Sequence, residues 1–109
     1  MSDSRRILQV GIIGCGEVTQ VIWLPTLALL NHYYRVKAIS DASADAVAFC
    51  RSRYPTPMAA KPQQICDDAE IDLVFVLSSD DTHEKFAKAA LASGKHVFVE
   101  KPMTLSHAR

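Results

Sequence analysis

The amino-acid sequence predicts an α/β fold in which helices cover both faces of a doubly wound parallel sheet, as in Rossmann-like domains. Three observations predict this fold. Short apolar runs alternate with segments of helical spacing along the 109 residues, as in a parallel sheet with right-handed crossovers. Residues 7–13 are nearly all apolar, and residues 73–77, the core of a second run over residues 71–78, are apolar on both faces, as expected for strands covered from both sides. The first run ends in a glycine turn that leads into a helix.

The first predicted unit is a buried strand over residues 7–13, a glycine turn, and a helix over residues 17–30. Apolar residues recur along this helix at roughly helical spacing, namely Val18, Val21, Ile22 and Leu29. Pro25 has no backbone N–H, so we expect a kink or break near Trp23 or Leu24.

Two shorter units follow the first one. A strand over residues 35–40 precedes a helix over residues 43–54, which Ser43 caps. One side of this helix presents Ala44, Val47, Ala48 and Arg51. Residues 56–60 form a short strand and residues 62–68 a short helix.

The strongest strand, residues 71–78, opens the last part of the chain. A helix over residues 82–93 follows it. The buried stripe of this helix consists of Phe86, Ala89 and Ala90. Gly94 ends the helix, residues 97–99 form the last strand, and a further helix is expected to begin within the final residues.

Composition limits the class of protein. Twelve basic and twelve acidic residues balance, which argues against a nucleic-acid partner or an anionic membrane surface. No apolar run is long enough to span a bilayer, so we expect a cytoplasmic protein without a membrane partner. The length suits one domain, residues 1–109. The cysteines, Cys15, Cys50 and Cys66, are widely spaced and lack zinc-site spacing, which indicates reduced thiols and no metal site.

The carboxyl ends of the predicted strands are where a doubly wound sheet binds ligands. The first of them carries Gly14 and Gly16, which fit the first two glycines of a G-x-G-x-x-G fingerprint and would let a nucleotide pyrophosphate approach the backbone. The helix that follows begins with Glu17 and Val18, which we place at the same site. Thr19 stands where the fingerprint usually has Gly or Ala.

Two more residues belong to this end of the sheet. Asp41 ends the second strand, where a carboxylate can accept hydrogen bonds from adenosine-ribose hydroxyls and would repel a 2′-phosphate. The sequence therefore favours NAD over NADP as the cofactor, and a helix cap or turn is the alternative role of Asp41. Cys15 lies between the glycines at a helix N-terminus, where a thiol pKa can be lowered. We interpret it instead as a small residue that fits the turn.

The strongest strand also ends in polar residues. Ser78, Ser79 and Asp80 follow it, and His83 lies in the first turn of the next helix. These four residues are candidates for cofactor contacts. Helix capping by the acid, and a solvated histidine, are the alternatives.

The last strand ends in Glu100 and Lys101, followed by a proline that cannot continue the ladder. Lys101 in this position can hydrogen-bond a ribose or a substrate hydroxyl, and with a lowered pKa it can act in proton transfer. A surface lysine before a turn is the alternative. Glu100 and Lys101 are both candidate cofactor contacts, and Lys101 is the catalytic candidate.

Together these motifs resemble the Gfo/Idh/MocA oxidoreductases, the glucose-fructose oxidoreductase and inositol dehydrogenase family. The resemblance covers residues 7–109. It rests on Gly11-Ile12-Ile13-Gly14-Cys15-Gly16, on Leu24-Pro25, and above all on Gly94-Lys95-His96-Val97 with Glu100-Lys101-Pro102.

The resemblance implies NAD(P)-linked hydride transfer at a secondary alcohol of a sugar, a cyclitol or a derivative. Lys101 would then orient the substrate hydroxyl and the nicotinamide ribose and assist proton transfer, and the Lys101–Pro102 bond would be cis. The family's usual Thr-Pro-Asn-x-x-His appears here with Ser78, Ser79 and Asp80 in its first places and His83 in its last.

Family members carry a second, α+β domain that holds the substrate. We therefore expect this chain to be the N-terminal dinucleotide domain alone, truncated before the last strand or strands. The last strand would then be an apolar edge that favours a homo-oligomer. A non-catalytic nucleotide-binding or regulatory module is the alternative, which Thr19 and the altered segment 78–80 keep open.

Overall fold

The described strands form a single parallel sheet in the order β3-β2-β1-β4-β5. The computed structural model describes residues 6–77 and 82–99, without the side chains of residues 82 and 83. The strands are β1 (Leu8–Ile13), β2 (Tyr34–Ser40), β3 (Met58–Ala59), β4 (Leu73–Val76) and β5 (His96–Val99).

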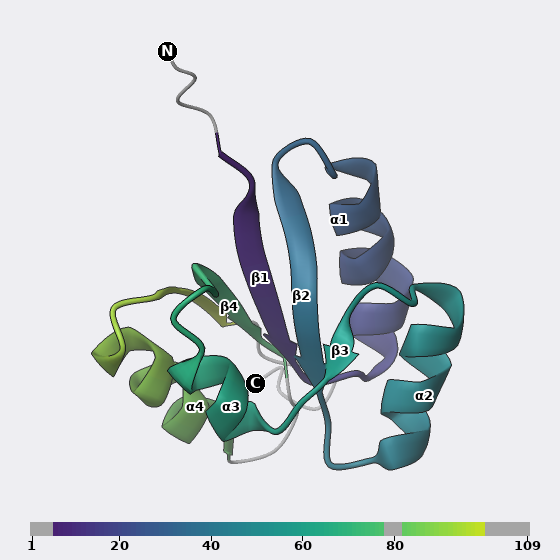
Figure 1. Cartoon of the computed structure of the whole chain (residues 1–109). Helices are drawn as coiled ribbons and strands as arrows, with labels where there is room; N and C mark the ends of the chain where they lie inside the picture. The colour runs from purple at the N-terminus through teal and green to yellow at the C-terminus, as the bar shows by residue number, and fades with distance from the viewer. Residues whose placement is uncertain (1–5, 78–81, 100–109) are drawn as a thin grey trace, which may run out of the picture.

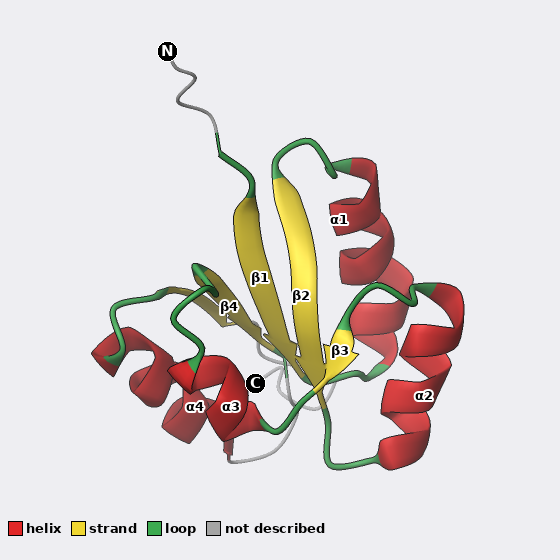
Figure 2. Ribbon diagram, viewed as in Figure 1, coloured by secondary structure: helices red, strands yellow, loops and turns green. Residues whose placement is uncertain are grey.

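Helices cover the sheet from both sides (Figure 1, Figure 2). On one side lie the π-helical segment η1 (Thr19–Trp23), α1 (Leu24–Leu29) and α2 (Ala44–Arg53). On the other side lie α3 (Pro62–Asp67) and α4 (Thr82–Ala92), which contact each other. The predicted doubly wound α/β fold is confirmed. In the described part of the chain, no helix has the length and apolar character needed to cross a membrane.

Neighbouring residues of β1 face opposite cores. Val10 and Ile12 are fully buried in the cluster that includes α1 and α2, whereas Ile13 belongs to the cluster that includes α3 and α4. Gly11 faces Ile65 of α3, and a Cβ at Gly11 would lie 2.5 Å from Cγ2 of Ile65. The missing side chain therefore lets α3 pack closely on the sheet.

The segment after the glycine turn is helical, but its inward face differs from the prediction. It runs as η1 and then as α1, with Pro25 in the first turn of α1, so the expected break near Trp23 or Leu24 is a change of helix type. The apolar residues expected to form one stripe are exposed, namely Val18 (37%), Val21 (64%), Ile22 (49%) and Leu29 (83%). Thr19, Leu24 and Leu27 are buried instead. A π-helical turn holds an extra residue, which rotates the later side chains around the axis.

The other helices begin and end close to the predicted residues. Ser43 caps α2 as expected, because its hydroxyl oxygen accepts the N–H of Ala46 at 3.1 Å. The side of α2 that packs on the core is shifted, since Ala46, Val47 and the buried Cys50 face it. Of the four residues predicted to share a side, only Val47 does so; Ala44, Ala48 and Arg51 are exposed. Gly94, with a φ of +82°, follows α4 as predicted.

Candidate functional site

The glycine turn lies at the carboxyl end of β1, the strand that separates β2 from β4. The order of the strands reverses here, which is where a doubly wound sheet binds ligands. Gly14 has a φ of +116°, a conformation that side chains rarely adopt. Its N–H donates to the carbonyl oxygen of Ser40 at 2.7 Å. The shape of the turn therefore depends on glycine at this position.

Asp41 braces the turn from the end of β2. Its Oδ2 accepts the N–H of Cys15 at 2.6 Å, and its Oδ1 accepts the N–H of Ser43 at 2.8 Å. The structure thus brings Asp41 and the glycine turn together, and it also gives Asp41 the turn role that was the alternative. Each carboxylate oxygen has a second lone pair, so a ribose hydroxyl can still donate to it.

Two side chains of the following helical segment hold the carbonyls of the turn. The hydroxyl of Thr19 donates to the carbonyl oxygen of Gly14, and Nε2 of Gln20 donates to that of Cys15 at 2.8 Å. Thr19 is only 1% exposed. The residue that departs from the fingerprint is therefore part of the turn's own hydrogen-bond network.

Gly16 borders open space. A Cβ placed on it would meet no protein atom within 4 Å, and the neighbouring Glu17 and Val18 are exposed. The first N–H groups of a helix have no partner within the helix and attract anions. The residues present therefore fit a pyrophosphate laid against the turn, with Gly16 leaving room for it.

Cys15 is a packing residue. Its side chain is fully buried, and burial, the neighbouring Cys50 and the Asp41 carboxylate together raise the pKa of its thiol far above the ordinary value. Its Sγ donates to the carbonyl oxygen of Ser40 at 3.6 Å. The thiol is thus protonated at neutral pH, which confirms the interpretation of Cys15 as a small residue that fits the turn.

The remaining predicted site residues fall on parts of the chain that the structure does not describe. They are Ser78, Ser79, Asp80, Glu100 and Lys101, together with the Lys101–Pro102 bond. His83 lies within α4, but its side chain is also outside the described part. Their roles stay predictions.

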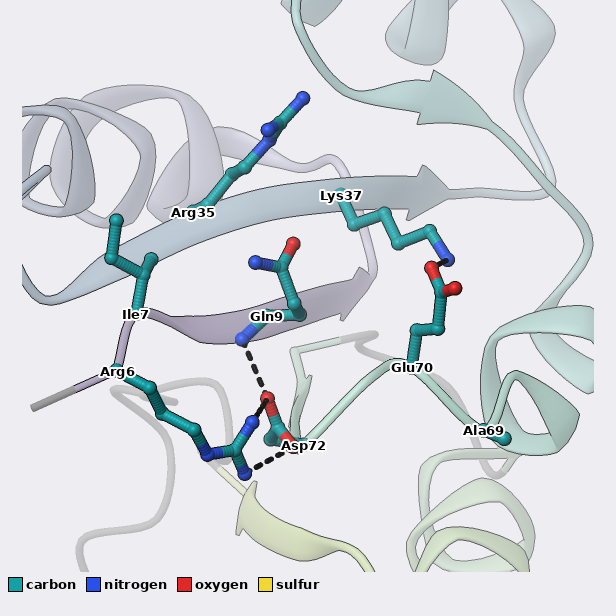
Figure 3. Close-up of a pocket in the computed structure, with 8 residues that line it drawn as sticks. All are labelled: Arg6, Ile7, Gln9, Arg35, Lys37, Ala69, Glu70 and Asp72. Atoms are coloured by element: carbon teal, nitrogen blue, oxygen red, sulfur yellow. Dashed lines mark hydrogen bonds and ion pairs between the residues drawn. The ribbon is translucent and has the colours of Figure 1, made fainter. Parts of the chain in front are cut away.

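A second polar cluster lies at the opposite end of the sheet, where β1 and β4 begin (Figure 3). Oδ2 of Asp72 accepts the N–H of Gln9 at 2.8 Å, and the Arg6 guanidinium contacts both carboxylate oxygens of Asp72 at 2.9 and 3.4 Å. The Gln9 N–H, followed by Arg6, lowers the pKa of Asp72. Among the charged residues that line the cavity of about 510 Å³ beside them, Arg6 pairs with Asp72 and Lys37 pairs with Glu70.

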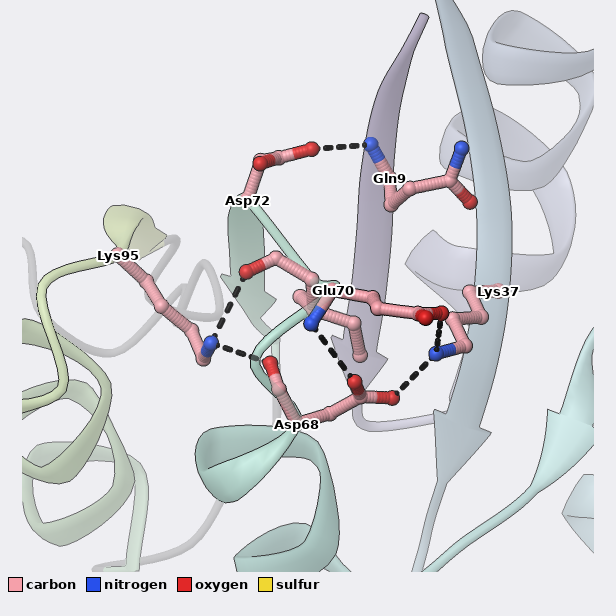
Figure 4. A network of polar contacts seen from close by, with 7 residues as sticks. Gln9, Lys37, Asp68, Glu70, Asp72 and Lys95 are labelled. Atoms are coloured by element: carbon pink, nitrogen blue, oxygen red, sulfur yellow. Dashed lines mark hydrogen bonds and ion pairs between the residues drawn. The ribbon is translucent and has the colours of Figure 1, made fainter.

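Lys95 and Lys37 complete this amino-end cluster (Figure 4). Lys95 is 8% exposed, and its Nζ donates to the carbonyl oxygens of Asp68 at 2.6 Å and Ile71 at 2.9 Å. Lys37 pairs with Asp68 at 2.7 Å and with Glu70 at 2.8 Å. Both lysines therefore hold the connection from α3 to β4. Lys95 belongs to the Gly94-Lys95-His96-Val97 motif, yet it lies at the amino end of the sheet, opposite the glycine turn.

Comparison with known proteins identifies the family. The sequence profile described as "Oxidoreductase family, NAD-binding Rossmann fold" matches residues 8–109. The chain belongs to the Gfo/Idh/MocA family of oxidoreductases. Inositol 2-dehydrogenase 2 of Saccharopolyspora erythraea is 36% identical to it over 88% of this chain and 28% of that protein. The oxidoreductase YdgJ of Escherichia coli is 37% identical over 100% of this chain and 30% of its own length.

The solved structures agree with this assignment. The 3-ketoreductase KijD10 from Actinomadura kijaniata, crystallised with NADP, has a TM-score of 0.76 and 28% identity, and the match covers 91% of this chain and 29% of that protein. The chain thus spans less than a third of the length of the relatives that it matches. Its fold is the NAD-binding Rossmann fold of the family, and both NAD and NADP are compatible with it.

Sequence reasoning missed the roles of Thr19 and Gln20. Both side chains bond to a carbonyl five residues earlier in the chain, and both lie at the start of the π-helical segment. The sequence offered one signal: Thr19, which carries a hydroxyl, stands at a fingerprint position that is usually occupied by a small, closely packed residue. We interpreted that residue as a departure from the fingerprint, whereas the structure gives it a hydrogen-bonding function.

Proposed function

We propose that this chain binds NAD(H) or NADP(H) and serves as the cofactor half of an oxidoreductase. The reaction would transfer hydride between the nicotinamide and a secondary alcohol of a sugar, a cyclitol or a derivative. One observation carries the proposal: Gly16 faces open space on a turn whose backbone is otherwise fixed by Ser40, Asp41, Thr19 and Gln20. The bound nicotinamide would supply or accept the hydride.

The chain's own residues would divide the work of binding. The backbone around Gly14, Gly16, Glu17 and Val18 would hold the pyrophosphate. Asp41 would accept hydrogen bonds from the adenosine ribose through the lone pairs that Cys15 and Ser43 leave free, which favours NAD over NADP.

The other predicted contacts concern the nicotinamide end. We propose that Ser78, Ser79, Asp80, His83 and Glu100 lie beside the cofactor. Lys101 would orient the substrate hydroxyl and the nicotinamide ribose and assist proton transfer. The position of each at or just after the end of a predicted strand supports this arrangement.

The substrate class follows from the relatives. Several of them carry names of inositol dehydrogenases, and one is a 3-ketoreductase solved with NADP. A small polyhydroxylated or keto compound is therefore the proposed substrate. Because this chain spans about 30% of those proteins, we assign it only the cofactor half, residues 1–109, and a substrate domain would complete the activity.

We also propose that β5 forms a contact between copies of this chain. It is the last strand in the described sheet, and its Phe98 and Val99 are 38% and 39% exposed. The Phe98 ring packs 5.1 Å from that of Trp23 and 5.2 Å from that of the buried Phe75, which holds the exposed part of Phe98 in a fixed position at this edge. Sedimentation at several concentrations tests this contact. The cysteines, which form no disulfide in the described residues, support a cytoplasmic location.

Titration with NADH and with NADPH, followed by fluorescence, tests the cofactor proposal. We expect saturable binding of at least one of them, tighter for NADH. Gly16→Val should weaken it about a hundredfold, since the side chain would fill the phosphate space. Its unfolding free energy should stay within about 1 kcal/mol of the parent, because the Cβ meets no protein atom. Absence of binding, or equal binding by the variant, would contradict the proposal.

A further inference from the structure

We propose that Thr19 and Gln20 are positioning residues that hold the glycine turn in the shape that binds a pyrophosphate. This inference rests on the proposed function, since it names which side chains prepare that site. Neither residue is expected to touch the cofactor. Each acts on it through the main chain of the turn.

The two hydrogen bonds repeat one geometry. The Thr19 hydroxyl reaches the carbonyl of Gly14, and the Gln20 amide reaches the carbonyl of Cys15, each five residues back. The main chain makes the same five-residue step, because the N–H of Leu24 donates to the carbonyl of Thr19. Two consecutive side chains at the start of the π-helical segment thus hold two consecutive carbonyls of the glycine turn.

These bonds fix the orientation of two peptide groups. A trans peptide points its C=O and its N–H in opposite directions. The peptide between Gly14 and Cys15 is held at both ends, by Thr19 at its carbonyl and by Asp41 at its N–H. The next peptide is held by Gln20 at the carbonyl of Cys15, which sets the direction of the Gly16 N–H. A backbone fixed before binding loses less conformational entropy when the ligand arrives.

Burial makes the Thr19 bond costly to lose. Thr19 is 1% exposed, and a buried carbonyl without a donor is unfavourable. A small Gly or Ala is usual at this place in the fingerprint for close packing of helix on strand. In this chain the hydroxyl does more than fill space. A change toward the usual fingerprint should consequently harm binding here.

The test measures NADH affinity in three Thr19 variants and one Gln20 variant. Thr19→Ala and the isosteric Thr19→Val should each weaken NADH binding about tenfold, whereas Thr19→Ser, which keeps the hydroxyl, should stay within about threefold of the parent. Gln20→Met removes the second bond from a partly exposed position and should weaken binding about threefold. Thermal unfolding of every variant is recorded in parallel.

Lys95→Met is the matched control, because it removes buried hydrogen bonds at the other end of the sheet. It should lower the melting temperature without changing NADH affinity. A merely structural role for Thr19 would make Thr19→Val behave like this control, and that result would overturn the inference while leaving the proposed function intact. If Thr19→Val does not fold, Gln20→Met decides in the same way. If the parent chain binds neither NADH nor NADPH, the proposed function fails first and the inference fails with it.

Discussion

The two ends of β1 are built alike but serve different purposes. At the amino end, Oδ2 of Asp72 accepts the N–H of Gln9 at 2.8 Å, and at the carboxyl end Oδ2 of Asp41 accepts the N–H of Cys15 at 2.6 Å. Asp72 lies just before β4, and Asp41 lies just after β2. The difference lies in what surrounds the two carboxylates.

Asp72 lies among charges that neutralise one another. Arg6 contacts its carboxylate, while Lys95 reaches the carbonyl of Ile71 just before it. Asp41 accepts hydrogen bonds from two neutral backbone N–H groups, those of Cys15 and Ser43, and the turn that it braces leaves open space at Gly16. A polar cluster whose charges are all paired stabilises the fold, whereas a braced backbone beside open space is available to a ligand.

The largest expected effect concerns Lys95. Lys95→Met keeps the apolar stem but removes both hydrogen bonds to the α3–β4 connection, and the carbonyl of Ile71 loses a buried donor. The unfolding free energy should fall by about 2 to 3 kcal/mol. Urea denaturation measures the loss, and NADH titration of the same sample should give the parent affinity.

Lys88→Met is the control for Lys95→Met. Lys88 pairs with Glu84 on the surface of α4, and its side chain is 75% exposed. Its loss should change stability by less than about 0.5 kcal/mol. A drop in NADH affinity for Lys95→Met at temperatures where the protein is folded would show that the two ends of β1 are not independent.

The fold and the glycine-turn end of β1 could be predicted from the sequence, whereas the amino-end cluster could not. The apolar runs predicted the strands. The positions of Gly14, Asp41 and Gly94 were also predicted correctly, because in each case a single residue indicates a turn of the backbone. The predicted inward face of the first helix was wrong, because the π-helical turn adds a residue that regular helical spacing does not contain. The structural role of Lys95 also could not be predicted, since the carbonyls to which it donates lie 24 and 27 residues away in the sequence.

The second prediction compares the two carboxylates directly. An amide accepts with only one oxygen, so Asp41→Asn leaves one of its two backbone N–H partners without an acceptor, and Asp72→Asn removes the ion pair with Arg6. Each should lose about 1 to 2 kcal/mol of unfolding free energy. Only Asp41→Asn should also weaken NADH binding, by about tenfold, because the turn and the proposed ribose contact both depend on it.

Each variant is the control for the other, since the same substitution is made at both ends of β1. Stability is read from urea denaturation and affinity from NADH fluorescence under the same buffer conditions. Equal loss of NADH affinity in both variants would place the cofactor site elsewhere or make it depend on global stability alone.

The smallest expected effect is the pH dependence of the amino-end cluster. The Gln9 N–H and the Arg6 guanidinium hold the pKa of Asp72 below its ordinary value, and Lys37 does the same for Asp68. A carboxyl whose pKa is lower in the folded state stabilises the protein above its unfolded pKa, about 3.9, and loses that contribution as pH falls through the folded value. Lowering the pH should therefore reduce the contribution of the amino-end cluster to the free energy of unfolding.

Urea denaturation of the parent and of Asp72→Asn at about pH 7 and about pH 3 tests this dependence. At neutral pH the parent should be the more stable. At acid pH the gap should narrow by up to about 1 kcal/mol, because the contribution of the Asp72 carboxylate is lost progressively as pH falls below the unfolded pKa toward the lower folded value. Arg6 is 69% exposed on its side chain, so added salt should shrink the neutral-pH gap without removing it, since the Gln9 N–H bond persists. A gap that is independent of pH would mean that the Asp72 contribution comes from shape and hydrogen bonding rather than from its charge, and the contrast between the two ends of β1 would then rest on the open space at Gly16 alone.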